Sequence, residues 1–282
     1  MAKVARCMCV GCNNIGTVKI SLDKRGNRAA YMCDYHAENN EWYGDGGKNE
    51  AGAVGKKRAK MYRFGVEFES AWTSDKVRIE FLGNGFTPTD DLSLDGDRTC
   101  EYVSPLYNGM NSIVRYVKSI DKYMKSGDIE LNASCGTHFH VSLNNMVMEN
   151  KENAMDYLKK EEIYKRVFMP LSKMLEEDPM TCAKVFGRPL NEDYASAIRE
   201  DFCDPKDRYN FVNVTNSNNI EFRVFKFRNA EQYTKAMWFA RDVVDSIMRN
   251  FSCFDQMTEE EQYHKCDVVA RKICKKYEAL SM

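Results

Sequence analysis

The clearest indication of the fold is a stretch in the middle of the chain, Cys135-Gly136-Thr137-His138-Phe139-His140-Val141-Ser142-Leu143. In a β-strand, side chains alternate between the two faces, so His138, His140 and Ser142 share one side and the intervening residues take the other. Two of the chain's four histidines would then point the same way. The stretch predicts a strand with one packed face and one polar face.

Two further runs repeat this alternation with acids and an arginine. They are Phe64-Gly65-Val66-Glu67-Phe68-Glu69 and Ile220-Glu221-Phe222-Arg223-Val224. Each sets apolar residues on one face and ionisable groups at positions i and i+2 on the other. Glu101 also has β-branched and aromatic neighbours, which favour a strand. These runs predict a single sheet with one apolar side and one ionisable side.

Bulk composition restricts the kinds of partner. At 282 residues the chain is long enough for one sizeable domain and a small appendage. The 41 Lys and Arg nearly balance the 42 Asp and Glu, so no global field recruits nucleic acid or an anionic membrane. No apolar run approaches the roughly 20 residues of a membrane span, and residues 1–7 lack the apolar core of a signal peptide. We expect a cytoplasmic protein with no membrane partner.

The N-terminal cysteines have the spacing of a metal site. Cys9 and Cys12 form a C-x2-C pair, Cys33 and His36 form a C-x2-H pair, and a strand–turn–strand pattern lies between them. Four such ligands suit a tetrahedral structural Zn²⁺. Cys7, at C-x4-C spacing from Cys12, is the alternative to Cys9, and coincidental free cysteines are the alternative to a metal site.

The chain is expected to have three parts. Residues 1–37 resemble a small zinc ribbon in ligand spacing, and this resemblance implies a module that binds protein or nucleic acid. Residues 38–60 are rich in Gly, Asn, Ala and Lys without apolar periodicity, which predicts a flexible linker. Residues 61–282 form the main domain. Its seven cysteines are expected to be reduced and mostly buried.

Helices and a hairpin are predicted in the main domain. Helices are expected at residues 111–126, 153–177, 231–250 and 258–280, with Pro170 kinking or dividing the second. Residues 72–86 fit a strand or a short helix equally well. A charged, irregular loop is expected at 186–207, and residues 208–214 and 220–224 are expected to form a hairpin.

The acids on the predicted strands need a cation if they share one cavity. Two carboxylates about 4 Å apart repel by roughly 4 kcal/mol at an effective dielectric constant near 20. Glu67, Glu69, Glu101 and Glu221 together would therefore oppose folding unless protons or metal ions relieved them. Hard oxygen ligands favour Mg²⁺ or Mn²⁺. Such an array, with arginines at its rim, suits polyphosphate chemistry.

Other catalytic classes fit less well. The chain has no H-E-x-x-H, no G-x-x-x-x-G-K-[ST] and no G-x-S-x-G motif. A glycosidase would use paired acids but would leave the paired histidines and Arg223 without a role. Cys135 and His138 are three residues apart, so in an extended strand they face opposite sides, which argues against a thiol nucleophile.

Several motifs follow one another in order. They are Phe64-Gly65-Val66-Glu67-Phe68-Glu69, Asp91-Leu92-Ser93, Glu101-Tyr102-Val103-Ser104-Pro105, Cys135-Gly136-Thr137-His138-Phe139-His140, Arg208-Tyr209-Asn210-Phe211-Val212-Asn213 and Ile220-Glu221-Phe222-Arg223. In order and number, these motifs resemble the glutamine synthetase-like carboxylate–amine ligases, and more narrowly the amidoligase family of bacteria and phages. The resemblance covers about residues 61–250. It implies an α+β fold in which a curved antiparallel sheet forms half a barrel, backed by helices, with ATP and two or more Mg²⁺ or Mn²⁺ ions on its concave face.

The resemblance also implies a division of labour among the metal ligands. Glu67, His138 and Glu221 would hold the metal that bridges the β- and γ-phosphates. Glu69 and Glu101 would hold a second metal nearer the acceptor carboxylate. As metal ligands, Glu67, Glu69 and Glu221 would be part of the catalytic centre.

Four further residues receive roles by the same resemblance. Arg223 would stabilise the phosphoryl group during transfer, and His140 would lie beside the nucleotide. Arg188 and Arg208 are weaker candidates for contact with a substrate carboxylate or phosphate, with surface salt bridges as the alternative.

The implied reaction phosphorylates a carboxylate with ATP and lets an amine attack the acyl phosphate, giving an amide or peptide-like bond. The substrates would be small molecules, peptides or proteins, and the zinc ribbon could select a macromolecule. One alternative is a phosphotransferase on the same scaffold, because guanidino kinases share this superfamily. Another is a zinc-ribbon interaction protein whose ligase-like domain has no catalytic activity.

Overall fold

The computed structural model describes residues 18–21, 29–32, 62–90, 94–95, 99–107, 109–143, 149–191, 193–200, 203–215, 219–251 and 253–282. Near the N-terminus, β1 (Val18–Ser21) and β2 (Ala29–Met32) pair in antiparallel fashion, as the strand–turn–strand pattern predicts. The predicted zinc ligands Cys7, Cys9, Cys12, Cys33 and His36, the linker 38–60 and the motif 91–93 lie outside the described residues.

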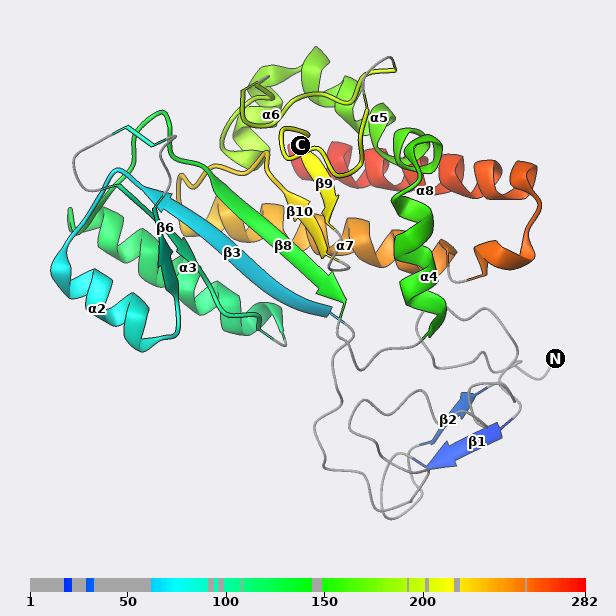
Figure 1. Cartoon of the computed structure of the whole chain (residues 1–282), viewed down its shortest axis with the longest axis horizontal. Coiled ribbons are helices and arrows are strands. Elements are labelled where there is room, and N and C mark those ends of the chain that lie inside the picture. The colour runs from blue at the N-terminus through cyan, green and yellow to red at the C-terminus, as the bar shows by residue number, and fades with distance from the viewer. Residues whose placement is uncertain are drawn as a thin grey trace.

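A six-stranded antiparallel sheet positions the polar residues of the main domain (Figure 1). Its strands are β3 (Tyr62–Ser70), β5 (Thr87–Thr89), β6 (Cys100–Val103), β8 (Thr137–Leu143), β9 (Val212–Thr215) and β10 (Asn219–Phe222). Their order across the sheet is β5-β6-β3-β8-β10-β9, so β5 and β9 are edges and the sheet does not close into a barrel. A separate two-stranded sheet pairs β4 (Trp72–Thr73) with β7 (Ile129–Glu130).

The predicted alternation is confirmed along β3 and β8. Phe64, Phe68 and Phe139 on the apolar face are all buried, and the rings of Phe64 and Phe139 stack with their centroids 6.0 Å apart. The predicted hairpin is also confirmed, because β9 and β10 pair in antiparallel register. A period of two residues thus separates the core side from the polar side on each central strand.

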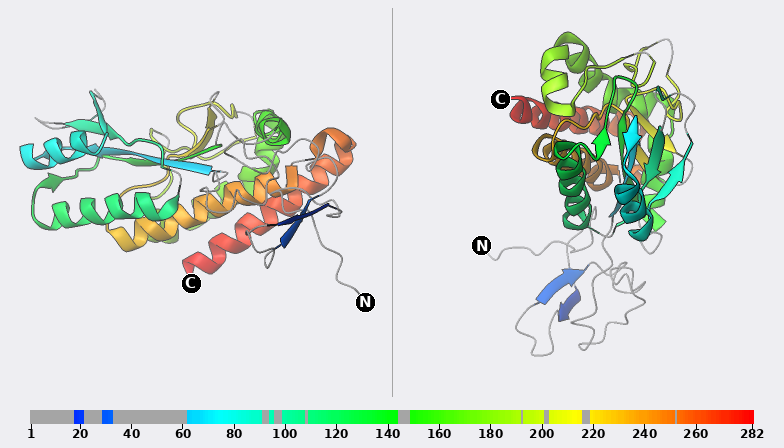
Figure 2. Two further views of the ribbon diagram at one scale, coloured as in Figure 1. Left: turned by 90° about the horizontal axis from the view of Figure 1, so that it is seen from below. Right: turned by 90° about the vertical axis from the view of Figure 1, so that its left-hand side faces the viewer.

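Seven helices lie in the described part of the main domain. They are α2 (Asp75–Gly83), α3 (Met110–Lys125), α4 (Glu149–Leu158), α5 (Glu161–Glu177), α6 (Pro179–Phe186), α7 (Ala230–Phe251) and α8 (Glu259–Ser281), with a 3₁₀ turn at Phe254–Gln256. Helices α3 and α7 cover the apolar face of the sheet, where they pack against β3 and β8 respectively, and α8 lies beyond α7 (Figure 2). The opposite face of the sheet therefore carries the ionisable residues.

Three of the four predicted helices are confirmed, but the expected helix at 153–177 is wrong as a single element. The chain breaks at Lys160, whose extended backbone begins α5, whereas Pro170 lies inside that helix. Pro170 removes a hydrogen bond at a cost of about 3 kcal/mol. The helix survives because it buries Ile163, Val167 and Leu171, each contributing about 1.5–3 kcal/mol. The two halves separate because α4 packs mainly on α7 and α5 on α8.

Helix α6 was not predicted, although its end signals are present in the sequence. The Asp178 side chain accepts a hydrogen bond from the Thr181 amide, and Pro179 occupies the first turn. Gly187 ends the helix at φ +93°, and a Cβ placed there would lie 1.8 Å from the Lys226 carbonyl oxygen. Only glycine fits this turn, and the irregular segment begins after it.

Three smaller expectations are also resolved. Residues 72–86 form both alternatives in succession, a two-residue strand followed by α2, which begins after the N-cap residue Ser74. Six cysteines of the main domain are free thiols, and five of these are buried: Cys100, Cys135, Cys182, Cys203 and Cys266, with Cys274 half-buried. Within the described part of the chain, no helix combines the length and apolar character needed to cross a membrane.

Candidate metal centre on the polar face of the sheet

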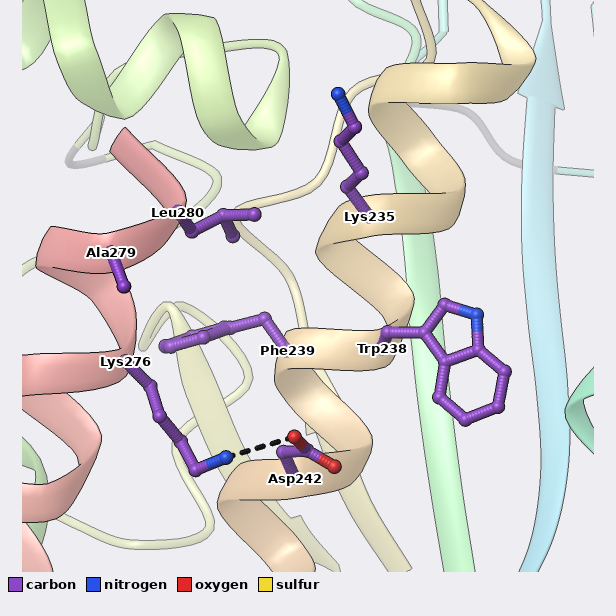
Figure 3. Close-up of a pocket in the computed structure, with 7 residues that line it drawn as sticks. All are labelled: Lys235, Trp238, Phe239, Asp242, Lys276, Ala279 and Leu280. Atoms are coloured by element: carbon purple, nitrogen blue, oxygen red, sulfur yellow. Dashed lines mark hydrogen bonds and ion pairs between the residues drawn. The ribbon is translucent and has the colours of Figure 1, made fainter. Parts of the chain in front are cut away.

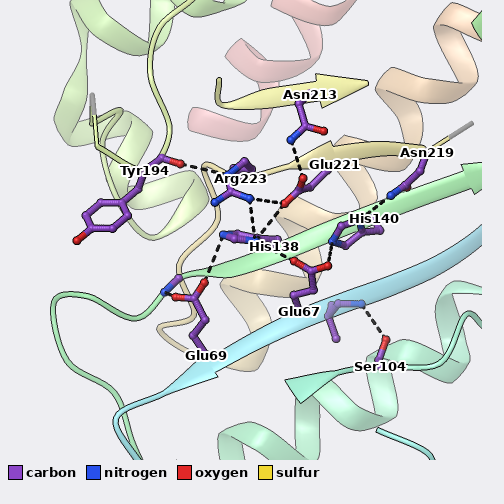
Figure 4. A network of polar contacts seen from close by, with 12 residues as sticks. Glu67, Glu69, Ser104, His138, His140, Tyr194, Asn213, Asn219, Glu221 and Arg223 are labelled. Atoms are coloured by element: carbon purple, nitrogen blue, oxygen red, sulfur yellow. Dashed lines mark hydrogen bonds and ion pairs between the residues drawn. The ribbon is translucent and has the colours of Figure 1, made fainter. Parts of the chain in front are cut away.

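Strand register brings the predicted site residues together in adjacent rows. Glu67 on β3 lies opposite His138 on β8, and Glu69 lies opposite Glu101 on β6. Glu221 on β10 lies opposite His140. Because these residues all lie on the polar face, those of β3, β8 and β10 form one network of side-chain contacts (Figure 4), and Glu101 lies beside it.

The Nδ1 atom of His138 is the meeting point of this network. It lies 3.1 Å from Glu67 Oε2 and 3.1 Å from Glu221 Oε1. The Nη1 atom of Arg223 lies 3.4 Å from the same nitrogen and donates a 2.7 Å hydrogen bond to Glu221 Oε1. A single N–H group cannot donate fully to two carboxylates, so the arrangement offers more acceptors than His138 can satisfy.

A second group lies on the other side of the same imidazole. His138 Nε2 is 3.6 Å from Glu69 Oε1, and Glu69 Oε2 accepts a hydrogen bond from the Gly136 amide. Ligand atoms of Glu67, His138 and Glu221 all lie within 4.8 Å of one another, and so do those of Glu69, Glu101 and His138. The five residues therefore make two adjoining candidate metal sites that share one histidine.

Electrostatic coupling holds these groups in defined charge states. Burial disfavours the imidazolium, but hydrogen bonds with Glu221 and Glu67 outweigh it and raise the pKa of His138 to about 9. Burial also opposes ionisation of Glu221, yet the contact with His138 lowers its pKa to about 2. Glu67 behaves in the same way, since His138 and His140 hold its pKa far below the ordinary value despite burial. Without metal, a proton on His138 compensates the two carboxylates.

The charge of Glu101 is less well compensated than the charges of Glu67 and Glu221. Burial and the negative charge of Glu67 raise its pKa to about 7. A divalent cation nearby would favour loss of the Glu101 proton, because it would stabilise the carboxylate form.

The spacing of the first group fits a small octahedral ion. Ligand atoms about 2.1 Å from Mg²⁺ lie about 3 Å apart when they are neighbours in an octahedron. The 3.1 Å separations from His138 Nδ1 to Glu67 and to Glu221 match this value. With Nδ1 as a ligand, the Nε2 proton would face Glu69, the arrangement by which carboxylates commonly orient metal-binding histidines. Two oxygens and one nitrogen suit Mg²⁺ or Mn²⁺.

His140 lies at the edge of this cluster. Its Nδ1 atom pairs with the Asn219 side-chain amide at 2.8 Å, which fixes the ring orientation. Its Nε2 atom is 3.1 Å from Glu67 Oε1 but is not aligned for a hydrogen bond with it. His140 therefore faces the network, with its buried Nε2 atom beside the Glu67 carboxylate.

The structure separates the two weaker arginine candidates. Arg188 is buried and one of its Nη atoms donates to the Arg223 carbonyl oxygen, which places it beside the cluster. Arg208 is exposed, and its guanidinium lies over the Tyr209 ring rather than against a member of the cluster. Cys135 is buried and burial raises the pKa of its thiol, which agrees with the argument against a nucleophile.

Sequence reasoning missed several residues that support the site. Asn213 donates a 2.6 Å hydrogen bond to Glu221 Oε2, and the Tyr194 carbonyl oxygen accepts one from Arg223 Nε at 3.4 Å. Asn213 lay in a predicted strand with the right alternation, so a search for polar residues on the ionisable face would have found it. Tyr194 lies in an irregular segment and no local pattern marks it.

The pockets on the helical side are separate from this cluster. One of about 360 Å³ lies between α7 and α8 and is lined by residues such as Trp238, Phe239 and Lys276 (Figure 3). An ion pair between Lys276 and Asp242 crosses it. No member of the candidate metal centre lines this pocket.

Comparisons with known proteins do not assign the chain to a family. No family model matches it, and no curated protein matches it either.

Proposed function

We propose that this chain is an ATP-dependent carboxylate–amine ligase that forms an amide or peptide-like bond through an acyl phosphate. The observation that supports this most strongly is the grouping of Glu67, His138 and Glu221, in which His138 Nδ1 lies 3.1 Å from each carboxylate, as neighbouring ligands of an octahedral ion would. Arg223 is paired with the Glu221 carboxylate of this group. Buried divalent sites flanked by a guanidinium suit polyphosphate better than a neutral substrate.

The chain's own residues would perform distinct steps. Glu67, His138 and Glu221 would hold one ion, and Glu69 with Glu101 a second. When bound, these Mg²⁺ or Mn²⁺ ions would supply charge neutralisation for the phosphates. Arg223, fixed by Glu221 and the Tyr194 carbonyl, would face the oxygens of the transferred group. His140 would lie beside the nucleotide.

The reaction balances in two transfers. A carboxylate oxygen of the acceptor attacks the γ-phosphorus of ATP and ADP leaves with the bond's electron pair. The amine nitrogen then attacks the acyl carbon, phosphate leaves, and the amine gives up a proton. The half-barrel curvature, the zinc ribbon with its macromolecular partner and a cytoplasmic location are further parts of this proposal.

The proposal is tested by ATP turnover and by product mass. We expect Mg²⁺-dependent ADP release when the protein is incubated with ATP and a cell extract, together with new masses one water lower than the sum of two substrates. Glu67→Gln and Glu221→Gln are expected to abolish both signals, whereas Glu130→Gln, at an exposed position on β7, is expected to change neither.

Two results would contradict the proposal. Variants at Glu67 and Glu221 that bind ATP and Mg²⁺ as tightly as the parent would show that the polar face is not the metal site. A stable phosphorylated product without any amide would instead identify a kinase.

A further inference from the structure

Tyr194 joins the two arginines of the site in a closed set of contacts. Its carbonyl oxygen accepts the hydrogen bond from Arg223 Nε (Figure 4), and its ring lies 5.8 Å from the Arg188 guanidinium carbon. Arg188 in turn donates to the carbonyl oxygen of Arg223. Each of the three residues therefore contacts the other two, and Tyr194 is the member that contributes no charge.

Arg188 is buried without enough partners for its five N–H groups. It is only 8% exposed, and its Nε has no hydrogen-bond partner among the described residues. Its Nη1 is 3.5 Å from the point where a Cβ on Gly136 would lie, and Glu69 Oε2 and His138 Nε2 are each 3.3 Å from that point. Gly136 thus leaves, between the guanidinium and the candidate metal ligands, a space in which a single methyl group would already be tightly packed.

The two guanidinium groups approach opposite nitrogens of His138. Arg223 lies near Nδ1, and Arg188 borders the space beside Nε2. Glu221 pairs with Arg223 at 2.7 Å, whereas no carboxylate among the described residues lies within ion-pair distance of Arg188. Burial therefore costs Arg188 solvation that its hydrogen bonds replace only in part. An oxyanion that accepts hydrogen bonds from the Arg188 fork would compensate this charge, with Arg223 as a second donor.

We propose that Tyr194 is a positioning residue that holds Arg188 and Arg223 together as a receptor for a substrate oxyanion. This inference rests on the proposed function for the identity of the substrate, because the oxyanion would be either a phosphate group or the acceptor carboxylate. The aromatic face stabilises Arg188 by a cation–π contact, and the carbonyl oxygen fixes the direction of Arg223.

Equilibrium binding separates this role from a merely structural one. With Mg²⁺ at saturation, calorimetry would measure the affinity of the parent for orthophosphate and for acetate. Tyr194→Ala is expected to weaken binding of the preferred anion about tenfold or more, since the ring that orients the Arg188 guanidinium is lost. Tyr194→Phe keeps the ring and the carbonyl, so it is expected to bind within about twofold of the parent.

Two controls show whether the effect is specific. Tyr194→Ala is expected to lower the melting temperature, because the cation–π contact with Arg188 is lost, but to keep the Mg²⁺ affinity of the parent. Tyr209→Ala, at an exposed tyrosine beside Arg208, is expected to leave anion binding unchanged. Arg188→Lys keeps the charge but loses the planar fork, and it is expected to bind the anion about tenfold more weakly. This variant decides the question if Tyr194→Ala does not fold.

The inference is overturned if Tyr194→Ala or Arg188→Lys binds both anions as tightly as the parent, or if the parent binds neither. Tighter binding of orthophosphate would assign the receptor to the phosphoryl group, and tighter binding of acetate to the acceptor. Both results support the receptor. Because the assay requires no amide formation, a protein that binds the anion through Tyr194 but makes no amide would refute the proposed function alone.

Discussion

Replacing Glu101 with Gln is expected to stabilise the metal-free protein above neutral pH and to reduce its response to metal. Burial and the charge of Glu67 raise the pKa of Glu101 to about 7, against an ordinary value of 4.5. The folded state therefore favours the neutral acid, so stability falls as pH rises from about 4.5 to about 7. Glutamine has the shape of the neutral acid and lacks the carboxylate charge.

The size of the effect follows from this shift. A difference of about 2.5 pH units corresponds to about 3.4 kcal/mol. Glu101 is only half-buried, so solvent screening reduces the expected gain to about 1–2 kcal/mol at pH 8. In a domain of this size that gain raises the melting temperature by about 3–6 °C. At pH 5 the parent carboxyl is already mostly protonated in the folded state, and the two proteins are expected to melt much closer together.

Thermal melts with EDTA at pH 5 and pH 8, repeated with Mg²⁺, measure these differences. Mg²⁺ is expected to stabilise the parent more than the variant, because the variant lacks a candidate ligand. Glu130→Gln removes an exposed carboxylate and is expected to change neither melt. The reasoning fails if Glu101→Gln melts at or below the parent at pH 8 without metal, or if Glu130→Gln gives the same gain.

Three further predictions concern protons, a supporting amide and a turn. Because the pKa of His138 is raised to about 9, protonated His138 stabilises the metal-free protein fully below about pH 6.5, and this stabilisation is lost as pH rises through about 9. Mg²⁺ must displace the proton on His138 when it binds. Calorimetry in two buffers should detect about one proton released at pH 7.5, with affinity rising about tenfold per pH unit; a flat profile contradicts the ligand assignment. Asn213→Ala is expected to weaken Mg²⁺ binding about tenfold, because the Glu221 carboxylate loses the hydrogen bond that orients it. An unchanged Mg²⁺ affinity would show that Asn213 does not orient this ligand. Gly187→Ala is expected to prevent folding or to lower the free energy of unfolding, measured in a urea melt, by more than about 4 kcal/mol. The control Gly83→Ala adds a Cβ with no neighbour within 4 Å, and its free energy of unfolding is expected to stay within about 1 kcal/mol of the parent.

Much of the local structure was predictable from the sequence. The alternation that places His138 and His140 on one face is a property of any strand, and it needs no knowledge of neighbouring strands. Local sequence signals also mark the ends of α6, with Asp178 as the N-cap residue and Gly187 at the C-terminal end, although the helix was not predicted. Helical periodicity identified α3, α7 and α8 but did not find the break at Lys160, because the packing of α4 and α5 on different partners produces it.

The amino-acid sequence alone determined which residues share a face, because that depends on a repeat of two along the chain. The tertiary structure decided which of them meet. The placement of β3 between β6 and β8 sets Glu69 against Glu101 and Glu67 against His138, and it comes from pairings between segments far apart in sequence. The same long-range packing brings Arg188 to the cluster and leaves Arg208 exposed. Strand order and register depend on how the whole core is buried, and no local pattern encodes them.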